Sequence, residues 1–246
     1  MDMLQVLKKD HQFTATLFNG KLVVNKPVVG GYTKAVAPYS NLFYWSHARA
    51  REACEFGLHP HKGFEIMTFV LEGSIAHFDT ASNVWTSLYA GDFQIIQSNR
   101  GIQHQERIAS GTRSFQIWFT PDFGEALQHN PAYLECRQAD VSRQEEPQFT
   151  TLTYVGLPGT PLPLTPGLTI KKLVFAEEKS ISLPLDDQSM YTFYVVSGTG
   201  TVNAQCIEPD DAIRLTDINR LDLTFAGELF YIQTPAHLPY KAAWTA

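Results

Sequence analysis

Short apolar segments separated by turn residues follow one another along much of the chain. From residue 64 to residue 120, apolar segments such as 66–71 and 93–97 alternate with turns at Gly73 and at 90–92. Short strands with turn signals about every ten residues are typical of an all-β sandwich or barrel. The pattern therefore predicts an all-β fold.

The second half of the chain repeats this pattern weakly. Residues 194–199, an apolar run that ends in a Gly turn, align with residues 69–74, and residues 209–213 align with residues 90–94. Such a repeat indicates two copies of one structural unit. We expect two β-barrels in one chain, each of about 100 residues, which is large enough to bury its own core.

A more polar stretch with several prolines lies between the two copies. Pro131 interrupts any long helix there, and a later proline-rich run is incompatible with a central strand. The prolines of that run are Pro158, Pro161, Pro163 and Pro166. We therefore predict an N-terminal domain over residues 1–125, a linker over 126–167 and a C-terminal domain over 168–246.

Histidine and glutamate recur at alternate positions in two segments of the N-terminal half. His59 and His61 form one pair, and His104 and Glu106 form the second. Alternate residues of a strand lie on one face, so two such pairs on neighbouring strands bring three imidazoles and one carboxylate to one point inside a barrel. Nitrogen and oxygen donors without thiolate suit iron(II), manganese, nickel, copper or zinc, and the donor types alone do not rank these metals.

Two residues near these pairs have alternative interpretations. Glu65 is a candidate ligand, but with Glu106 available we expect it to support the site or to pair with Lys62 or Arg100. His77 lies within a predicted strand, where we expect a packed or exposed side chain rather than a ligand.

The C-terminal copy has lost the candidate ligands. When the two halves are aligned as above, the four ligand positions correspond to Pro184, Asp186, Leu223 and Phe225. We expect no second metal site in this half, and a structural or substrate-covering role for it.

Composition and charge argue against several classes of partner. The net charge is -6 and the chain has no cluster of Lys or Arg, whereas nucleic acids and anionic membranes require a basic face. The three cysteines are widely separated and form no Cys-x-x-Cys motif, which favours a reducing compartment. No apolar run has the length of a signal-peptide core or a membrane span, so we expect a cytoplasmic protein.

The segments around the histidine pairs resemble the pirin family. The resemblance rests on residues 59–65 (His-Pro-His-Lys-Gly-Phe-Glu), 70–75 (Val-Leu-Glu-Gly-Ser-Ile), 90–94 (Ala-Gly-Asp-Phe-Gln) and 100–106 (Arg-Gly-Ile-Gln-His-Gln-Glu). It covers residues 57–120 closely and the second half only in outline. It implies a bicupin, with two jelly-roll-type cupin barrels and iron(II) bound in the N-terminal one.

The same resemblance implies ligands and an activity. The family's ligands fall on His59, His61, His104 and Glu106 of this sequence. Some bacterial members have quercetin 2,3-dioxygenase activity, and eukaryotic members act as iron-dependent nuclear cofactors of transcription. We predict an oxidoreductase that cleaves a flavonol such as quercetin with O₂, with Glu106 acting as ligand and general base in turn.

Two other functions are compatible with this sequence. An iron-dependent binding or redox-sensor module would regulate a protein partner without turnover, although the lack of a basic patch argues against a nuclear role. A sugar isomerase of the cupin class would need a cationic side chain to hold a phosphate, and Lys62 and Arg100 are the nearby candidates.

Overall fold

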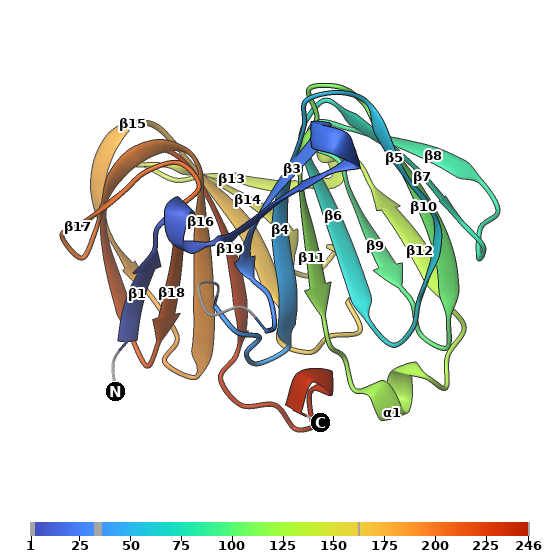
Figure 1. Cartoon of the computed structure of the whole chain (residues 1–246). Coiled ribbons are helices and arrows are strands. Elements are labelled where there is room, and N and C mark those ends of the chain that lie inside the picture. Colours follow the sequence, from blue (N-terminus) through green and yellow to red (C-terminus); the bar gives the residue numbers. More distant parts are fainter. Residues whose placement is uncertain (1–2, 32–35, 162, 246) are drawn as a thin grey trace. The chain divides into compact units, whose positions relative to one another are not determined.

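The computed structural model describes residues 3–31, 36–161 and 163–245, and these residues are almost entirely in strands and loops (Figure 1). Within them, the one α-helix, α1 (Phe123–Ala126), is a single turn. Short 3-10 turns complete the helical content, at η1 (Lys9–His11), η2 (Phe18–Gly20), η3 (Gln138–Asp140) and η4 (Ala243–Thr245). The predicted all-β fold is confirmed. In this part of the chain, no helix is long and apolar enough to cross a membrane.

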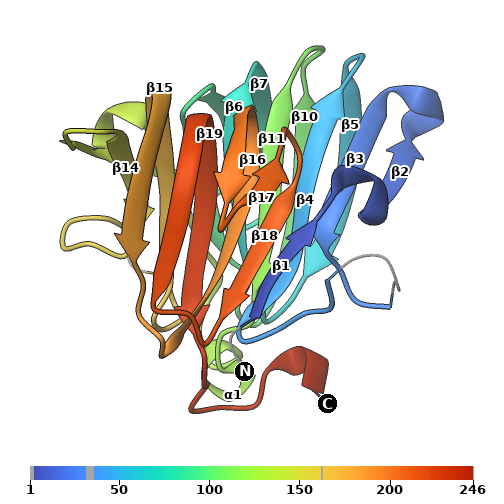
Figure 2. The same cartoon turned by 90° about the vertical axis from the view of Figure 1, so that its left-hand side faces the viewer.

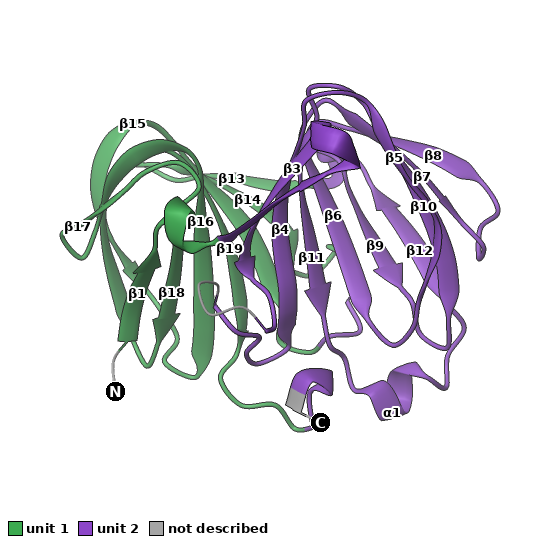
Figure 3. Cartoon of the chain, viewed as in Figure 1, with its two compact units in different colours: residues 1–12, 141–162, 166–239 green, residues 13–140, 163–165, 240–246 purple. Residues whose placement is uncertain are grey.

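The chain divides into two compact units (Figure 3). Unit 1 comprises residues 1–12, 141–162 and 166–239, and unit 2 comprises residues 13–140, 163–165 and 240–246. The two units therefore take their residues from interleaved segments, whereas the sequence suggested three consecutive ones. The first strand of the chain illustrates the difference, because it belongs to the same unit as the C-terminal half.

The segment expected to be a linker, 126–167, contains three strands. β12 (Ala132–Cys136) pairs with β9 (Phe93–Gln97) in unit 2, and β13 (Ser142–Glu145) pairs with β14 (Thr150–Val155) in unit 1. All four residues of β13 are exposed. A strand is recognised in a sequence by alternating apolar residues. β13 has no such alternation, and its strand structure depends on backbone hydrogen bonds.

Unit 2 consists of two antiparallel sheets (Figure 1). The smaller sheet has the strand order β5 (Cys54–His61), β10 (Ile102–Ile108), β7 (Ser74–Asp79) and β8 (Trp85–Tyr89). The larger sheet has the order β12, β9, β6 (Glu65–Glu72), β11 (Arg113–Phe119), β4 (Leu42–Ala50), β3 (Leu22–Val28) and β2 (Phe13–Leu17).

The two sheets of unit 2 pack their inner faces together. Burial alternates strictly along β7 and nearly so along β10, so one face of each strand is turned inward. Ile75 and Ile108 of the smaller sheet pack with Leu22, Val24 and Val70 of the larger one. Each fully buried side chain of this kind stabilises the fold by roughly 1.5–3 kcal/mol.

Unit 1 is one antiparallel sheet of eight strands (Figure 2). Its order is β1 (Met3–Leu7), β18 (Ala212–Thr216), β16 (Ser189–Val202), β19 (Arg220–Pro235), β15 (Thr169–Pro184), β14 and β13, and β17 (Gln205–Ile207) pairs with β16. The three longest strands, β15, β16 and β19, contain register shifts in their pairing. Such irregularities bend a strand, which allows the sheet to curve around its own core.

The core of unit 1 includes two of the four positions that align with the candidate ligands of unit 2, and both are apolar. Leu223 and Phe225 are almost fully buried in it, with Phe175, Phe193 and Leu229. The backbones of β16 and β19 approach each other closely at Gly198. A Cβ at this position would lie 1.9 Å from the backbone oxygen of Ala226, and the φ of +88° also favours glycine.

The buried carboxylate of Asp92 connects the turn between β8 and β9 to the end of β12 through hydrogen bonds. Asp92 is 7% exposed and accepts hydrogen bonds from the backbone N–H groups of Tyr89 at 3.0 Å and Gln138 at 2.9 Å, and from Arg137 at 2.9 Å. Burial alone would raise the pKa of Asp92, but these two amides and the guanidinium outweigh it and hold the pKa below its usual range.

We expect Asp92→Asn to lower the free energy of unfolding at pH 7 by about 1–3 kcal/mol, because one acceptor oxygen and its charge are lost. The pKa of Asp92 is lower in the folded state, so its contribution is present above the unfolded pKa and disappears as pH falls through the folded one. Urea unfolding at pH 7 and pH 3 measures both effects. The exposed Glu125→Gln is the control, and an equal loss at both pH values would contradict this assignment.

Candidate metal centre

Three histidines gather on two adjacent strands of the smaller sheet of unit 2. His59 and His61 lie two residues apart on β5, and His104 lies on β10 directly opposite His59. One nitrogen atom from each ring can be chosen so that all three lie within 4.8 Å of one another. Among the described residues, this is the one group of three or more possible metal ligands so closely spaced.

A β-bulge fixes the direction of His59. The register between β5 and β10 shifts between His104 and Glu106, where β5 has an additional residue. Bulges of this kind re-aim side chains. The carbonyl oxygen of Gly57, in this bulge, lies 2.8 Å from Nδ1 of His59. This hydrogen bond places the ring proton on Nδ1 and leaves the lone pair of Nε2 available for a metal.

The protein interior keeps two of the imidazoles uncharged. His104 is fully buried, and burial together with the neighbouring rings of His59, His61 and His77 lowers its pKa to about 2. Burial and the nearby His59 lower the pKa of His61 to about 4. At neutral pH both rings are therefore neutral, which is the form that binds metals.

The chemistry of this group fits a metal ion. Both ring nitrogens of His104 are buried, and neither has a hydrogen-bond partner among the described residues. An unpaired buried polar atom costs free energy, and a coordinated cation would remove that cost. Nitrogen donors of this type suit first-row divalent metals.

Glu106 lies two residues beyond His104 on β10, and its carboxylate contacts Gln116. It is 4% exposed, and burial raises its pKa to about 7 although the Gln116 hydrogen bonds oppose the rise. Nε2 of Gln116 lies 3.5 and 3.3 Å from the two carboxylate oxygens. Trp118 donates a hydrogen bond to Oε1 of Gln116 at 3.2 Å, which orients the amide N–H₂ toward Glu106.

The structure thus brings three of the four predicted ligands into one group. No carboxylate oxygen of Glu106 belongs to the group of atoms within 4.8 Å. The side chain lies on the correct strand and two residues from His104, so its role as a ligand stays a prediction.

Aromatic rings pack against the histidines from β11 and the neighbouring segments. The ring of Trp118 is edge-on to His61, with 4.8 Å between centroids. Phe64 and Phe43 pack against Trp118 at 5.5 and 6.3 Å. These rings form an apolar surface beside the imidazole of His61.

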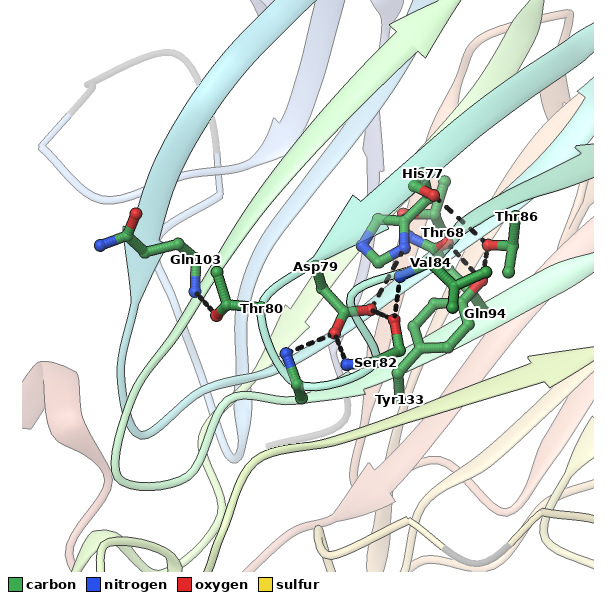
Figure 4. Close-up of polar contacts among 11 residues, drawn as sticks. Thr68, His77, Asp79, Thr80, Ser82, Val84, Thr86, Gln94, Gln103 and Tyr133 are labelled. Carbon is green, nitrogen blue, oxygen red and sulfur yellow. Dashed lines mark hydrogen bonds and ion pairs between the residues drawn. The ribbon is translucent and has the colours of Figure 1, made fainter.

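A polar network surrounds His77 and Tyr133 (Figure 4). His77 of β7 is fully buried, with its ring 5.5 Å from that of His104, and it stacks on Tyr133 of β12 at 4.6 Å. The Tyr133 hydroxyl contacts Thr86 at 2.8 Å and donates to Gln94 at 3.3 Å. Sequence analysis missed Tyr133 because it belongs to the stretch expected to be a linker, where a single tyrosine gives no signal.

The sequence suggested that Glu65 supports the metal site or pairs with Lys62 or Arg100, and the structure shows different contacts. It is fully buried, and its carboxylate accepts hydrogen bonds from the backbone N–H groups of Leu164 at 2.9 Å and Thr165 at 3.1 Å, and from Gln97 at 3.3 Å. It is not in the histidine group, and it forms no ion pair within the described chain. The expectation is corrected: Glu65 anchors a distant chain segment, which local sequence does not reveal.

Part of the chain matches a known family model. Residues 26–119 match the family model described as Pirin. A Zymomonas mobilis protein whose name reads "Putative quercetin 2,3-dioxygenase" is 29% identical over 184 residues, which cover 73% of this chain and 75% of that protein. The Quercetin 2,3-dioxygenase of Escherichia coli K12 is 44% identical over 70 residues, 27% of this chain and 30% of that protein.

A solved structure extends the likeness to the whole fold. The crystal structure of the bacterial pirin YhhW from Escherichia coli in complex with nickel(II) has a TM-score of 0.77 and 22% sequence identity, and the match covers 96% of this chain and 100% of that one. At this level of identity the likeness concerns the fold, and it supports the predicted pair of cupin-type barrels.

We expect His104→Ala to abolish stoichiometric binding of nickel(II) or iron(II), because this ring supplies the most buried donor of the group. Elemental analysis and titration calorimetry measure the bound metal. The exposed His129→Ala, in the same unit, is the matched control and should bind as the unaltered chain does. Undiminished binding by His104→Ala would place the metal elsewhere.

We expect Glu65→Gln to leave metal content unchanged and to lower the free energy of unfolding by about 1–3 kcal/mol, because an amide N–H₂ replaces one of the two oxygens that accept hydrogen bonds from backbone N–H groups. Urea unfolding and elemental analysis of the same preparation separate the two effects. Loss of metal without loss of stability would instead assign Glu65 to the metal centre.

Proposed function

We propose that the chain is a pirin-like, metal-dependent dioxygenase that cleaves a flavonol such as quercetin with O₂; the match of residues 26–119 to the family model described as Pirin supports this. The observation that carries this proposal is the convergence of His59, His61 and His104 inside a barrel. The names of the relatives from Zymomonas mobilis and Escherichia coli support it. A fold and a ligand set do not by themselves determine a reaction, so the substrate class is the part that the experiment must test.

We propose that His59, His61, His104 and Glu106 hold the metal. Iron(II) is our first choice, and nickel, manganese, copper and zinc suit the same donors; the Escherichia coli pirin structure contains nickel(II). When bound, the ion would supply a Lewis acid and a centre for reaction with O₂. Four protein ligands of an octahedral site leave two positions for other groups.

Glu106 is the proposed general base. A catalytic base works best when its pKa is close to the working pH, and burial brings the pKa of Glu106 to about 7 in the metal-free chain. A carboxylate oxygen of Glu106 would take the proton of the flavonol 3-hydroxyl. The amide of Gln116 would then stay hydrogen-bonded to the other oxygen and keep the side chain oriented.

The aromatic rings near His61 are the proposed contact for the planar substrate. Trp118, Phe64 and Phe43 offer ring faces and edges of the kind that aromatic ligands stack on. Their packing would also exclude water from the reacting end of the substrate, which strengthens the electrostatic interactions there.

The deciding experiment uses protein purified without oxygen, loaded with iron(II) and mixed with quercetin and O₂. We expect oxygen uptake and carbon monoxide release in proportion to flavonol consumed, and no turnover by His59→Ala. Glu106→Gln should lower kcat by about 10²–10⁴-fold, the usual contribution of a general base. The exposed Glu55→Gln, on the outer face of β5, is the matched control and should keep full activity.

The same experiment distinguishes the proposed dioxygenase from the alternative function, a binding module without turnover. Bound iron without turnover of any flavonol would reject the dioxygenase and favour an iron-dependent module that regulates a protein partner. Turnover that survives in His59→Ala would reject this metal centre as the site of the reaction.

A further inference from the structure

Four buried polar side chains lie next to one another on the inner face of β7 and β10. The pairing of these strands places Asp79 opposite His104 and His77 opposite Glu106. His104 and Glu106 are candidate ligands of the metal centre, whereas neither residue of β7 belongs to the group of closely spaced ligand atoms. His77 and Asp79 therefore adjoin the metal centre without being part of it.

One ring nitrogen of His104 would remain unsatisfied when the other binds a metal. A metal-binding histidine almost always donates its second ring N–H to a hydrogen-bond acceptor. The carbonyl oxygen of Gly57 is that acceptor for His59. Both ring nitrogens of His104 are buried, and in the described part of the chain neither has a hydrogen-bond partner. A buried N–H of this ring therefore needs an acceptor close by.

His77 is the neighbouring ring that can accept this hydrogen bond. Three imidazole rings lie next to that of His104, with centroid distances of 4.3, 4.8 and 5.5 Å for His59, His61 and His77, respectively. The first two rings supply the other candidate ligand atoms. The ring nitrogens of His77 are both buried, and neither forms a hydrogen bond with a described residue. Of these three rings, His77 is thus the one that the metal does not require.

Asp79 determines which nitrogen of His77 carries the proton (Figure 4). Its Oδ2 lies 3.7 Å from Nδ1 of His77, and a negative charge at this distance favours the proton on that nitrogen. Burial lowers the pKa of His77 to about 4, although Asp79 opposes the shift. At pH 7 the ring is therefore neutral and has one N–H and one lone pair. The lone pair is then on Nε2, where it can accept a hydrogen bond.

Both side chains of β7 are held in place by their own contacts. Oδ1 of Asp79 accepts hydrogen bonds from the backbone N–H groups of Ala81 at 2.8 Å and Ser82 at 2.7 Å, and Oδ2 accepts one from the Ser82 hydroxyl at 3.0 Å. The ring of His77 stacks on Tyr133, with 4.6 Å between centroids and 10° between planes. The turn after β7 thus fixes the carboxylate, and the stacked tyrosine fixes the plane of the imidazole.

We propose that His77 and Asp79 position His104 for the metal: the free N–H of His104 donates to Nε2 of His77, and the Nδ1–H of His77 is directed at Asp79. Such donation makes the ligating imidazole a stronger electron donor and fixes its orientation. Both are positioning residues, because they contact neither the metal nor the substrate. This inference rests on the proposed metal centre, since it requires His104 as a ligand, but not on the identity of the substrate.

Competition titration of zinc(II) between the full-length chain and a chelator measures the effect on metal affinity. We expect His77→Phe to weaken zinc(II) binding by about 10–100-fold, the usual loss when such a hydrogen-bond partner is removed. The phenyl ring keeps a surface for stacking on Tyr133 but has no nitrogen. His77→Gln has an amide oxygen that can accept the N–H of His104, and it should recover most of the affinity.

Thr86→Val distinguishes positioning of His104 from a general loss of stability. The Thr86 hydroxyl contacts Tyr133 at 2.8 Å and donates to the backbone oxygen of His77 at 3.5 Å, so it belongs to the same network but does not bind the ring of His77. This variant should unfold at lower urea concentration and keep the zinc(II) affinity of the unaltered chain. Urea unfolding of metal-free His77→Phe verifies that this variant is folded.

The tautomer of His77 is a second readout, which a purely structural role would leave undetermined. Zinc(II) is diamagnetic, so nitrogen-15 NMR of the zinc-loaded chain can locate the ring protons. We expect the proton of His77 on Nδ1, and one metal-bound nitrogen and one N–H in the ring of His104. In His77→Phe, this N–H of His104 should lose its hydrogen-bonded chemical shift.

Three results would overturn the inference and leave the metal centre in place. They are undiminished zinc(II) affinity of His77→Phe, an equal loss of affinity in Thr86→Val, and a proton on Nε2 of His77 in the zinc-loaded chain. Absence of zinc(II) binding by the unaltered chain would overturn the metal centre and this inference together. Failure of quercetin cleavage alone would reject only the proposed dioxygenase.

Discussion

The antiparallel pairing of β5 with β10 is the constraint on which the candidate metal centre depends. It places His104 opposite His59 and, through one bulge, directs the ring of His59. A slip of this pairing by one residue would turn every side chain of β10 to the other face, so that Gln103 and Gln105 would replace the two candidate ligands inside the barrel. Burial of Ile102 and Ile108 at the two ends of the strand opposes such a slip, because both would become exposed.

Polar side chains inside unit 2 are held in two different ways. Some are joined in hydrogen-bonded chains, such as Trp118 to Gln116 to Glu106, and these are compatible with a rigid interior. Others are buried without partners among the described residues, as the two ring nitrogens of His104 are. His104 lies at the place where we infer a metal ion. Proteins tolerate such local costs at functional sites and offset them through packing elsewhere.

The sequence was sufficient for the features that depend on local spacing. The all-β fold followed from short apolar runs between turns, and the histidine group followed from alternation along two strands. Contacts between residues far apart in the chain were not predictable. Glu65 has a carboxylate like any candidate ligand, and only the return of the chain at Thr165 assigns it to a structural role. β13 was missed because a strand with exposed side chains carries no alternating pattern, and Tyr133 was missed because a single tyrosine in an expected linker gives no signal.

The pairing of β1 with β18 has a consequence for how the chain folds during synthesis. Met3 pairs with Thr216 and Leu7 with Ala212, so during synthesis β1 waits for a partner strand that lies about 200 residues later in the chain. Most of unit 2, from β2 to β12, is complete long before that point. Contacts between residues so distant in the chain form slowly, and an unpaired strand edge invites association with other chains in the meantime. Most of the unit that contains the candidate metal centre can therefore form before β18 has been made, whereas the sheet of unit 1 cannot be completed until then.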